Sequence, residues 1–193
     1  QVDLSIETPK ETYKPLYDEL MTKLIVLQQR ARAKGIGLVA LFEGWNGAGK
    51  GSRIGDLLHN LDARATHVHV LSNFDQDEAA RFRDMGTGVT GFAPLMQEFW
   101  QALGPRGDMT IYERGWYTAA ARRLLYTDKE DLAKSYEASI HGFEKQLAAD
   151  GYVIVKFFVH ISQGAQEKRL RRLHEDPDTS WRVTKQELER IKD

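Results

Sequence analysis

"LFEGWNGAGKGSRI", residues 41–54, follows an apolar run and precedes a helical pattern, and this context decides the fold. The stretch contains the spacing Gly44-x-x-x-x-Gly49-Lys50, which is typical of a phosphate-binding loop between a strand and a helix. Backbone N–H groups of residues 46–51 can point into one concave nest, to which the helix adds its positive N-terminal end. The stretch therefore predicts a phosphate cradle at the carboxyl end of a strand.

The loop residues have different expected roles. Lys50 would bring a mobile ammonium group to oxygens between two phosphates. In ordinary loops of this type the next residue gives a hydroxyl to magnesium, but here that residue is Gly51. Because Ser52 comes one position later and would point elsewhere on the helix, metal binding would depend on carboxylates from other segments. The predicted phosphate-binding residues of the loop are Gly44, Gly47, Ala48, Gly49, Gly51 and Ser52.

Length, charge and composition limit the classes of protein that fit. The 193 residues suffice for one domain with a hydrophobic core. The formal net charge of −1 gives no global basic field for nucleic acid, so a polyanion site must be local. The absence of cysteine excludes disulfides, thiolate zinc sites and cysteine nucleophiles. No apolar run approaches the roughly 18 residues of a membrane span, and no signal peptide is visible, so we expect a cytoplasmic protein with no membrane or nucleic-acid partner.

Hydrophobic patterning predicts strands that alternate with helices. The expected strands are 36–44, 65–71, 109–113 and 152–161, and the expected helices are 10–34, 49–60, 92–103, two within 115–148, and 163–174. Residues 72–91 are polar and glycine-rich, which predicts a mobile loop with a short helical turn. Alternation over this length predicts an α/β domain with a mostly parallel central sheet.

A second polar group follows the predicted strand 109–113. "MTIYERGWY" places Glu113 and Arg114 at the carboxyl end of that strand, where ligands gather in open α/β sheets. An acid there can hold magnesium, and the adjacent arginine can reach phosphate oxygens with its planar fork. The alternative is a surface Glu-Arg pair that closes the strand. Trp116 and Tyr117 are interpreted as core packing in preference to base stacking.

Four separated blocks of the sequence resemble the polyphosphate kinase 2 family. They are "FEGWNGAGKGSRI", "YERGWY", "FEKQLAADGYVIVKFFVHIS" with the following Gln166 and Arg169, and "DPDTSWRVT". The corresponding family signatures are E-G-x-D-x-x-G-K-G, D-R-S-W-Y, a lysine-bearing strand leading to I-S-x-x-E-Q-x-x-R, and D-P-x-x-x-W-K. Their order is kept from about Phe42 to Thr184, and the unusual glycine after the loop lysine agrees as well.

The resemblance implies a three-layer P-loop kinase fold with a mostly parallel central sheet, similar to nucleoside-monophosphate kinases and equipped with a helical lid. Residues 1–193 would be a single domain with an N-terminal helix in 1–36, a core in 37–161, and the lid and the start of a C-terminal part in 162–193. Because the family continues for several tens of residues and includes members with two fused copies, we expect a piece of a longer chain that acts as a homo-oligomer or beside a tandem partner domain.

The implied activity is transfer of a phosphoryl group between inorganic polyphosphate and a nucleotide (AMP, ADP or GDP), assisted by Mg²⁺. The resemblance assigns catalytic roles to Lys50, Glu113, Arg114 and Asn46, and metal binding to Glu113 and Asn46. Arg169 would face the polyanion as a lid arginine. The run "KRLRRLH" at 168–174 adds Arg171 and Arg172 as phosphate-binding candidates, and Arg122 and Arg123 could extend the path.

The sequence departs from the family pattern at four positions. Asn46 and Glu113 replace aspartates, and Ala119 and Leu173 replace arginines. Asparagine can keep the hydrogen-bond geometry of an aspartate but loses its negative charge. Glu43 and the pair Asp75 and Asp77 are candidates to compensate, although the pair also fits a solvated loop.

Three functions remain open at this point. The first is a polyphosphate-dependent nucleotide phosphotransferase. The second is a non-catalytic domain of the same fold, which would bind polyphosphate or nucleotide without turnover or pack beside an active partner. The third is an ATP-dependent kinase of a nucleoside or other small metabolite, which would need no polyanion path.

Overall fold

The computed structural model describes residues 3–4, 6–71, 94–125, 130–189 and 191. The predicted loop 72–91, with Asp75 and Asp77, lies outside the described residues. None of the described helices is both long and apolar enough to cross a lipid bilayer.

The described strands form one parallel sheet in the order β2-β3-β1-β4. They are β1 (Leu38–Gly44), β2 (Thr66–Val70), β3 (Met109–Glu113) and β4 (Val153–Val159). Leu38 lies opposite both Met109 and Val153, so the three strands β1, β3 and β4 start at the same level. Since all four run in the same direction, the segments that follow their carboxyl ends meet at one edge of the sheet.

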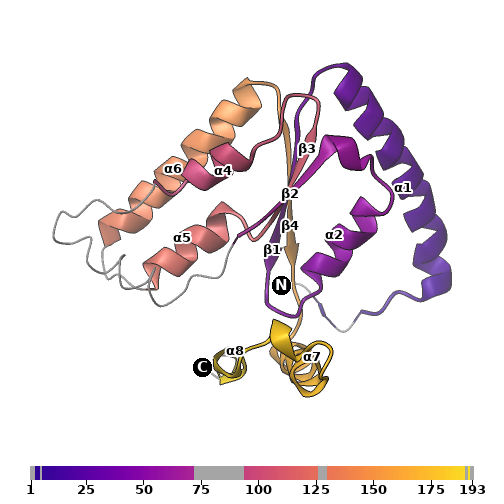
Figure 1. Cartoon of the computed structure of the whole chain (residues 1–193), viewed down its shortest axis with the longest axis vertical. Coiled ribbons are helices and arrows are strands. Elements are labelled where there is room, and N and C mark those ends of the chain that lie inside the picture. The colour runs from indigo at the N-terminus through magenta and orange to yellow at the C-terminus, as the bar shows by residue number, and fades with distance from the viewer. Residues whose placement is uncertain (1–2, 5, 72–93, 126–129, 190, 192–193) are drawn as a thin grey trace.

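Helices cover both faces of this sheet, which gives three layers (Figure 1). Helices α1 (Lys10–Ala33) and α2 (Lys50–Leu58) lie on one side, and α4 (Gln97–Ala102), α5 (Trp116–Leu124) and α6 (Glu130–Ala149) lie on the other. Helices α7 (Gln163–Glu175) and α8 (Lys185–Glu189) form a separate group beyond the end of β4. Short 3₁₀ turns occupy Ala63–Ala65 (η1) and Ser180–Arg182 (η3). The predicted three-layer α/β fold is confirmed.

Alternation along the central strand divides the hydrophobic core in two. Val39 and Leu41 pack with the cluster on the α5 and α6 side, whereas Ala40 and Phe42 pack with the cluster on the α2 side. Trp116 is fully buried in the first cluster, so its interpretation as core packing is confirmed. The period of two in a strand explains why an unbroken apolar run can serve both faces.

One predicted helix boundary is wrong. The helix expected at 92–103 begins only at Gln97, and Gln97 N–H donates to the carbonyl of Pro94 in a preceding turn (3.0 Å). The residues Leu95 and Met96 form this turn in place of the first turn of the expected helix. Helix α8 has no predicted range, and the remaining described helices and strands lie within a few residues of theirs.

A buried amide joins α1 to the edge of the sheet. Gln28 has no exposed surface, and its Nε2 donates to the Thr66 hydroxyl at 2.8 Å while its Oε1 accepts from the Asp62 N–H at 3.0 Å. The Thr66 hydroxyl in turn donates to the Asp62 carbonyl (2.8 Å). Each polar atom of the Gln28 side chain therefore has a partner, as burial of an amide requires.

Gln28→Ala is expected to lower the free energy of unfolding by about 2–4 kcal/mol, because it removes two hydrogen bonds and leaves a cavity. Urea denaturation followed by circular dichroism measures the change. The neighbouring Leu27→Ala, at a side chain that is 55% exposed, should change stability by less than about 0.5 kcal/mol. Equal losses in the two variants would contradict this account of Gln28.

Candidate phosphate-binding site

The glycine loop leaves β1 under a tight steric constraint at Gly44. The φ angle of Gly44 is +123°, and a Cβ atom there would lie 2.1 Å from the carbonyl oxygen of Val159 on β4. No other residue type fits this position without moving the backbone of β4. The loop then turns into α2, whose N-cap residue Gly49 has a φ of +97°. The direction in which the loop departs is thus fixed by the pairing of β1 with β4.

Lys50 is enclosed by the loop that precedes it. The residue is only 4% exposed, and its Nζ donates to the carbonyl oxygens of Gly44 (2.8 Å) and Trp45 (2.9 Å). The pKa of Lys50 is lowered from its ordinary 10.5 to about 8, mainly by burial and in second place by the positive charge of Arg114. The carboxylates of Glu113 and Glu43 act in the opposite direction. Lys50 is therefore a cation that an anionic ligand would stabilise.

Arg114 links the end of β3 to the loop. Its N–H donates to the Phe42 carbonyl of β1 (2.9 Å), and its Nη2 donates to Asn46 Oδ1 (2.9 Å). The φ angle of Arg114 is +59°, a left-handed conformation that costs free energy in a residue other than glycine. Among the described residues, Arg114 is the one non-glycine residue with positive φ. Backbone strain of this kind is concentrated at functional sites, where surrounding contacts maintain it.

Glu113 lies beside the first turn of α2. A Cβ atom on Gly51 would be 3.6 Å from Oε2 and 3.8 Å from Oε1 of Glu113. The carboxylate thus occupies the neighbourhood that the side chain after the loop lysine would otherwise enter. Mg²⁺ is usually bound by one or two carboxylates together with substrate phosphates, so a single acid at this point suits that ion. Its role as a metal ligand stays a prediction.

Glu43 has a structural role. Its Oε1 accepts from the N–H groups of Gly115 (3.2 Å) and Thr118 (3.3 Å), and its Oε2 accepts from the Thr118 hydroxyl. These groups belong to the first turn of α5, where a carboxylate satisfies free N–H groups and complements the helix dipole. Its oxygens bind α5, and its negative charge also raises the pKa of Lys50, so compensation by Glu43 for the missing aspartate stays a prediction.

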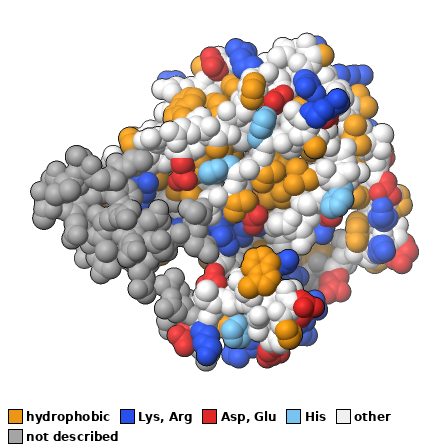
Figure 2. Space-filling view, in the orientation of Figure 1, with side chains coloured by type: hydrophobic (Ala, Val, Ile, Leu, Met, Phe, Trp, Pro, Cys, Tyr) orange, Lys and Arg blue, Asp and Glu red, His pale blue; other side chains and the backbone are white. Residues whose placement is uncertain are grey.

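The segment 163–189, called here the α7–α8 segment, contacts the loop from outside. Arg169 Nη1 donates to the carbonyl of Gly47 (3.2 Å) and lies 3.5 Å from that of Ala48. The buried Leu170 side chain lies 3.2 Å from the position of a Cβ on Gly47. Figure 2 shows this segment as a lobe of its own, with Lys and Arg side chains in the hollow between it and the main body.

The other predicted phosphate-binding groups are placed less centrally. Arg171 pairs with Glu167 of the same helix (2.7 Å), and both Arg171 and Arg172 are exposed. Ser52 is exposed in the first turn of α2. The structure therefore brings Asn46, Lys50, Glu113 and Arg114 together at the loop, with Arg169 at its outer side, whereas Arg171 engages its own helix.

Glu187 of α8 reaches the loop although the sequence reasoning did not single it out. Its Oε1 accepts from Asn46 Nδ2 at 3.2 Å, across 141 positions of sequence. The local signal is the spacing Thr184-x-x-Glu187, which is typical of a capping box at a helix N-terminus. That signal predicts the start of α8, but it does not reveal that the acid also contacts the glycine loop.

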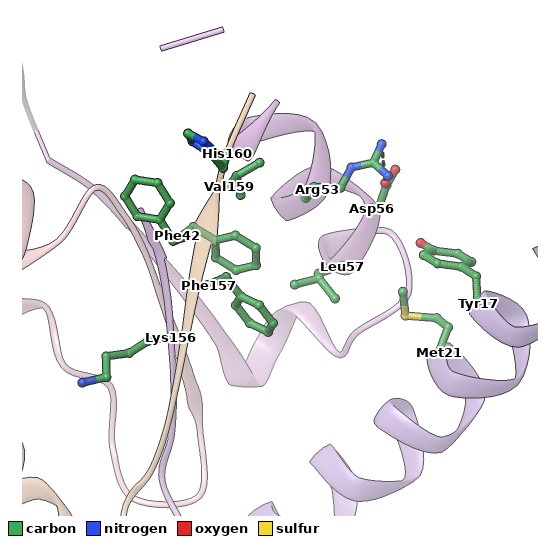
Figure 3. A pocket seen from close by; sticks show the side chains of 11 residues that line it. Tyr17, Met21, Phe42, Arg53, Asp56, Leu57, Lys156, Phe157, Val159 and His160 are labelled. Carbon is green, nitrogen blue, oxygen red and sulfur yellow. Dashed lines mark ion pairs between the residues drawn. The ribbon is translucent and has the colours of Figure 1, made fainter. Parts of the chain in front are cut away.

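An apolar cavity of about 620 Å³ lies elsewhere, between α1, α2 and the edge strand β4 (Figure 3). The Phe42 and Phe157 rings stack in its wall with centroids 4.9 Å apart, and Arg53 pairs with Asp56 (3.1 Å) at its side. Its lining includes neither Lys50 nor the three residues gathered with it. Apolar walls offer little to a phosphate chain, so the loop remains the candidate site.

The parallel sheet with a glycine loop that leads into α2 defines the class of P-loop kinase-like α/β domains. Two comparisons of the amino-acid sequence with known proteins then identify a family within this class. The family model described as polyphosphate kinase 2 matches residues 7–193. A polyphosphate:AMP phosphotransferase of Pseudomonas syringae pv. tomato is 30% identical over 185 residues, which are 95% of this chain and 34% of that protein. The chain belongs to the polyphosphate kinase 2 family.

Further relatives agree with this assignment. A GDP-polyphosphate phosphotransferase of Mycobacterium tuberculosis is 27% identical over 175 residues, which are 89% of this chain and 55% of that protein. The crystal structure of polyphosphate kinase 2 from Arthrobacter aurescens TC1 superposes with a TM-score of 0.81 at 21% identity, over 99% of this chain and 67% of that one. This last likeness shows the fold. The chain thus spans about a third of the Pseudomonas relative and about half of the Mycobacterium relative.

The pKa of Lys50 predicts how binding of a phosphate chain depends on pH. With the pKa near 8 in the ligand-free protein, Lys50 loses its charge as the pH rises through 8, whereas an ordinary lysine would keep it to about 10.5. A bound polyanion raises this pKa, so the affinity for tripolyphosphate should fall as the pH increases above 8. Titration calorimetry at several pH values between 6.5 and 9.5 measures the slope.

Lys50→Arg provides the comparison, because a guanidinium stays charged throughout this range. Its affinity for tripolyphosphate should be nearly constant between pH 7.5 and 9.5, whatever its absolute value. If the wild-type protein and Lys50→Arg lose affinity equally above pH 8, the decline does not come from Lys50.

Proposed function

We propose that this domain transfers a phosphoryl group between inorganic polyphosphate and a nucleoside mono- or diphosphate such as AMP, ADP or GDP. One observation carries the proposal. In a chain of the polyphosphate kinase 2 family, the buried Lys50 is surrounded by Arg114, Glu113 and the Asn46 amide at the carboxyl edge of the sheet. Phosphoryl transfer asks a protein mainly for alignment and for neutralisation of charge, and this group can supply both.

Each of the four residues has a defined part in the proposal. Lys50 neutralises charge on the transferred phosphoryl group, and the Arg114 fork holds phosphate oxygens of the nucleotide or of polyphosphate. Asn46 orients Arg114 through the 2.9 Å hydrogen bond between them. Their closeness is supported by the effect of the Arg114 charge on the pKa of Lys50.

Magnesium is the cofactor in this proposal. Glu113 would hold the ion, with Asn46 as a further oxygen ligand, and the carboxylate beside Gly51 supports this assignment. Bound there, Mg²⁺ would neutralise negative charge on phosphate oxygens. Since Asn46 Oδ1 already accepts from Arg114, the amide oxygen would have to serve both partners.

Polyphosphate would approach along the side of the loop that the α7–α8 segment covers. Arg169 stands at the loop itself, Arg171 and Arg172 lie exposed on the same helix, and the charge of Arg122 is close enough to lower the pKa of Lys50. In this proposal these cations would form a local basic path in a nearly neutral chain. We propose in addition that the whole protein acts as a homo-oligomer or beside a tandem partner domain.

Two substitutions support a second candidate, a related domain that binds polyphosphate or nucleotide without turnover. Position 46 carries an amide where the family carries an acid. Ala119, where the family has an arginine, is buried in the core cluster and presents no charge to the loop. Binding without any product would favour this candidate.

The test is a transfer assay on the complete gene product with polyphosphate, Mg²⁺ and AMP, ADP or GDP, with nucleotides separated by anion-exchange chromatography. Lys50→Ala should lower kcat/KM at least about 100-fold, because it removes a cation that stabilises transferred charge. Lys34→Ala serves as the matched control, since Lys34 is exposed at the opposite end of β1 from the loop.

The outcomes separate the candidates. Product from the wild-type protein and from Lys34→Ala, but not from Lys50→Ala, supports transfer at this loop. If the wild-type protein forms no more product than Lys50→Ala, the proposal fails, and calorimetric binding of polyphosphate by the same sample then identifies a non-catalytic binding domain. An ATP-dependent metabolite kinase would show ATP binding that long-chain polyphosphate does not displace.

A further inference from the structure

The carboxylate of Glu187 is held in a fixed orientation by the start of its own helix. Its Oε2 accepts from the N–H of Thr184 (2.9 Å) and lies 3.2 Å from the Thr184 hydroxyl, which also receives the Glu187 N–H at 3.2 Å. This reciprocal arrangement is a capping box. It leaves Oε1 to face the glycine loop, where it accepts from Asn46 Nδ2.

Chemistry permits one orientation of the Asn46 amide in this position. A guanidinium can only donate hydrogen bonds, and an ionised carboxylate can only accept them. The amide oxygen must therefore face Arg114 (2.9 Å) and the amide nitrogen must face Glu187 (3.2 Å). Arg114, Asn46 and Glu187 thus form a chain of two hydrogen bonds, each of which joins a donor to an acceptor.

An aspartate at position 46 would not fit this chain. It could accept from Arg114, but its second oxygen would then face the Glu187 carboxylate with no proton between the two acceptors. Like charges at hydrogen-bonding distance in a partly buried site repel strongly. The asparagine is thus matched to the acid on α8, and the pair carries one negative charge in total.

Contacts from α7 attach the same segment to the other side of the loop. Arg169 donates to the Gly47 carbonyl (3.2 Å), and Leu170 packs against Gly47. The α7–α8 segment therefore touches the glycine loop at two places, through α7 at Gly47 and through α8 at Asn46.

We propose that Glu187 is a positioning residue for the reaction, acting through Asn46. It fixes the amide so that Oδ1 holds the Arg114 guanidinium at the mouth of the loop, and it keeps the α7–α8 segment closed over that loop. The carboxylate of Glu187, which contacts the Asn46 amide, also provides the negative charge that the Asn46 side chain itself lacks. The expected effects on the reaction rate rest on the proposed transfer activity. The contact between the Asn46 and Glu187 side chains can be tested without that activity.

The contact between Asn46 and Glu187 can be tested by exchanging the amide and the carboxylate between the two positions. In Glu187→Gln, an amide N–H₂ group faces the Asn46 N–H₂ group, and in Asn46→Asp, two carboxylates face each other, so each single variant should break the contact. In the double variant Asn46→Asp/Glu187→Gln, the new glutamine donates to the new aspartate, which still accepts from Arg114. The net charge of the pair is the same as in the wild-type protein.

Two measurements on the full chain report whether the hydrogen bond between Asn46 and Glu187 is formed. Hydrogen–deuterium exchange of backbone amides in residues 163–189 should become about 5–10-fold faster in both single variants, because one hydrogen bond that holds the segment is lost, and should return to within about 2-fold of wild type in the double variant. In the transfer assay, kcat/KM should follow the same pattern, so that Asn46→Asp alone lowers the rate.

Glu189→Gln makes the same chemical change at an exposed position of the same helix and should leave both measurements unchanged. Circular dichroism of every variant before the assays confirms that the domain is folded. The inference is overturned if the double variant shows the sum of the two single effects, or if Asn46→Asp alone exchanges as slowly as wild type and reacts faster.

Failure of the proposed function gives a different result. One result is that no protein forms product, but hydrogen–deuterium exchange is faster in both single variants and returns toward wild type in the double variant. The contact between Glu187 and Asn46 is then supported, and the transfer activity is not. If the wild-type protein forms product and neither measurement shows coupling, the activity stands and the role of Glu187 does not.

Discussion

Strand β1 is paired with β3 on one side and β4 on the other, and its five central residues are buried on both faces. Its carboxyl end therefore has almost no freedom, and at Gly44 the backbone lies so close to the Val159 carbonyl that a side chain is excluded. This single constraint decides where the glycine loop leaves the sheet. The placement of Lys50 above the loop carbonyls, and of Arg114 beside Asn46, depends on that starting point.

The site gathers charge in a chain whose overall charge is close to zero. Burial and the neighbouring Arg114 work against protonation of Lys50, while Glu113 and Glu43 favour it. A bound polyanion would stabilise these neighbouring cations and favour the protonated, charged form of Lys50. The strained backbone of Arg114 is maintained by its N–H bond to Phe42 and by its guanidinium contact with Asn46. Membership of the polyphosphate kinase 2 family and the local electrostatics both support the proposed phosphate-chain ligand.

The α7–α8 segment joins this site through contacts that span much of the chain. Arg169 is 122 positions from Gly47, and Glu187 is 141 positions from Asn46. Because α7 and α8 contact two different residues of one short loop, the position of the segment and the conformation of the loop are not independent. The Asn46 amide therefore has to be considered together with the Glu187 carboxylate that accepts from it, and not as an isolated position of the loop.

The sequence by itself determined the layered α/β fold, the parallel sheet and the location of the phosphate loop. The periodicity of apolar residues and the spacing of Gly44, Gly49 and Lys50 are local properties of the sequence, and local backbone conformation follows from them. Trp116 was recognisable as core for the same reason.

Only the tertiary structure decided how the acids are used. Glu43 follows from the sequence as a strand-end acid, but whether it caps α5 or faces the loop depends on where Gly115 and Thr118 lie. Glu187 shows a capping box in the sequence, yet its contact with Asn46 exists only because α8 is carried back over the loop. Charges act through distance in space, and a sequence pattern specifies such distances only within a few residues, so the electrostatic design of the site required the folded chain.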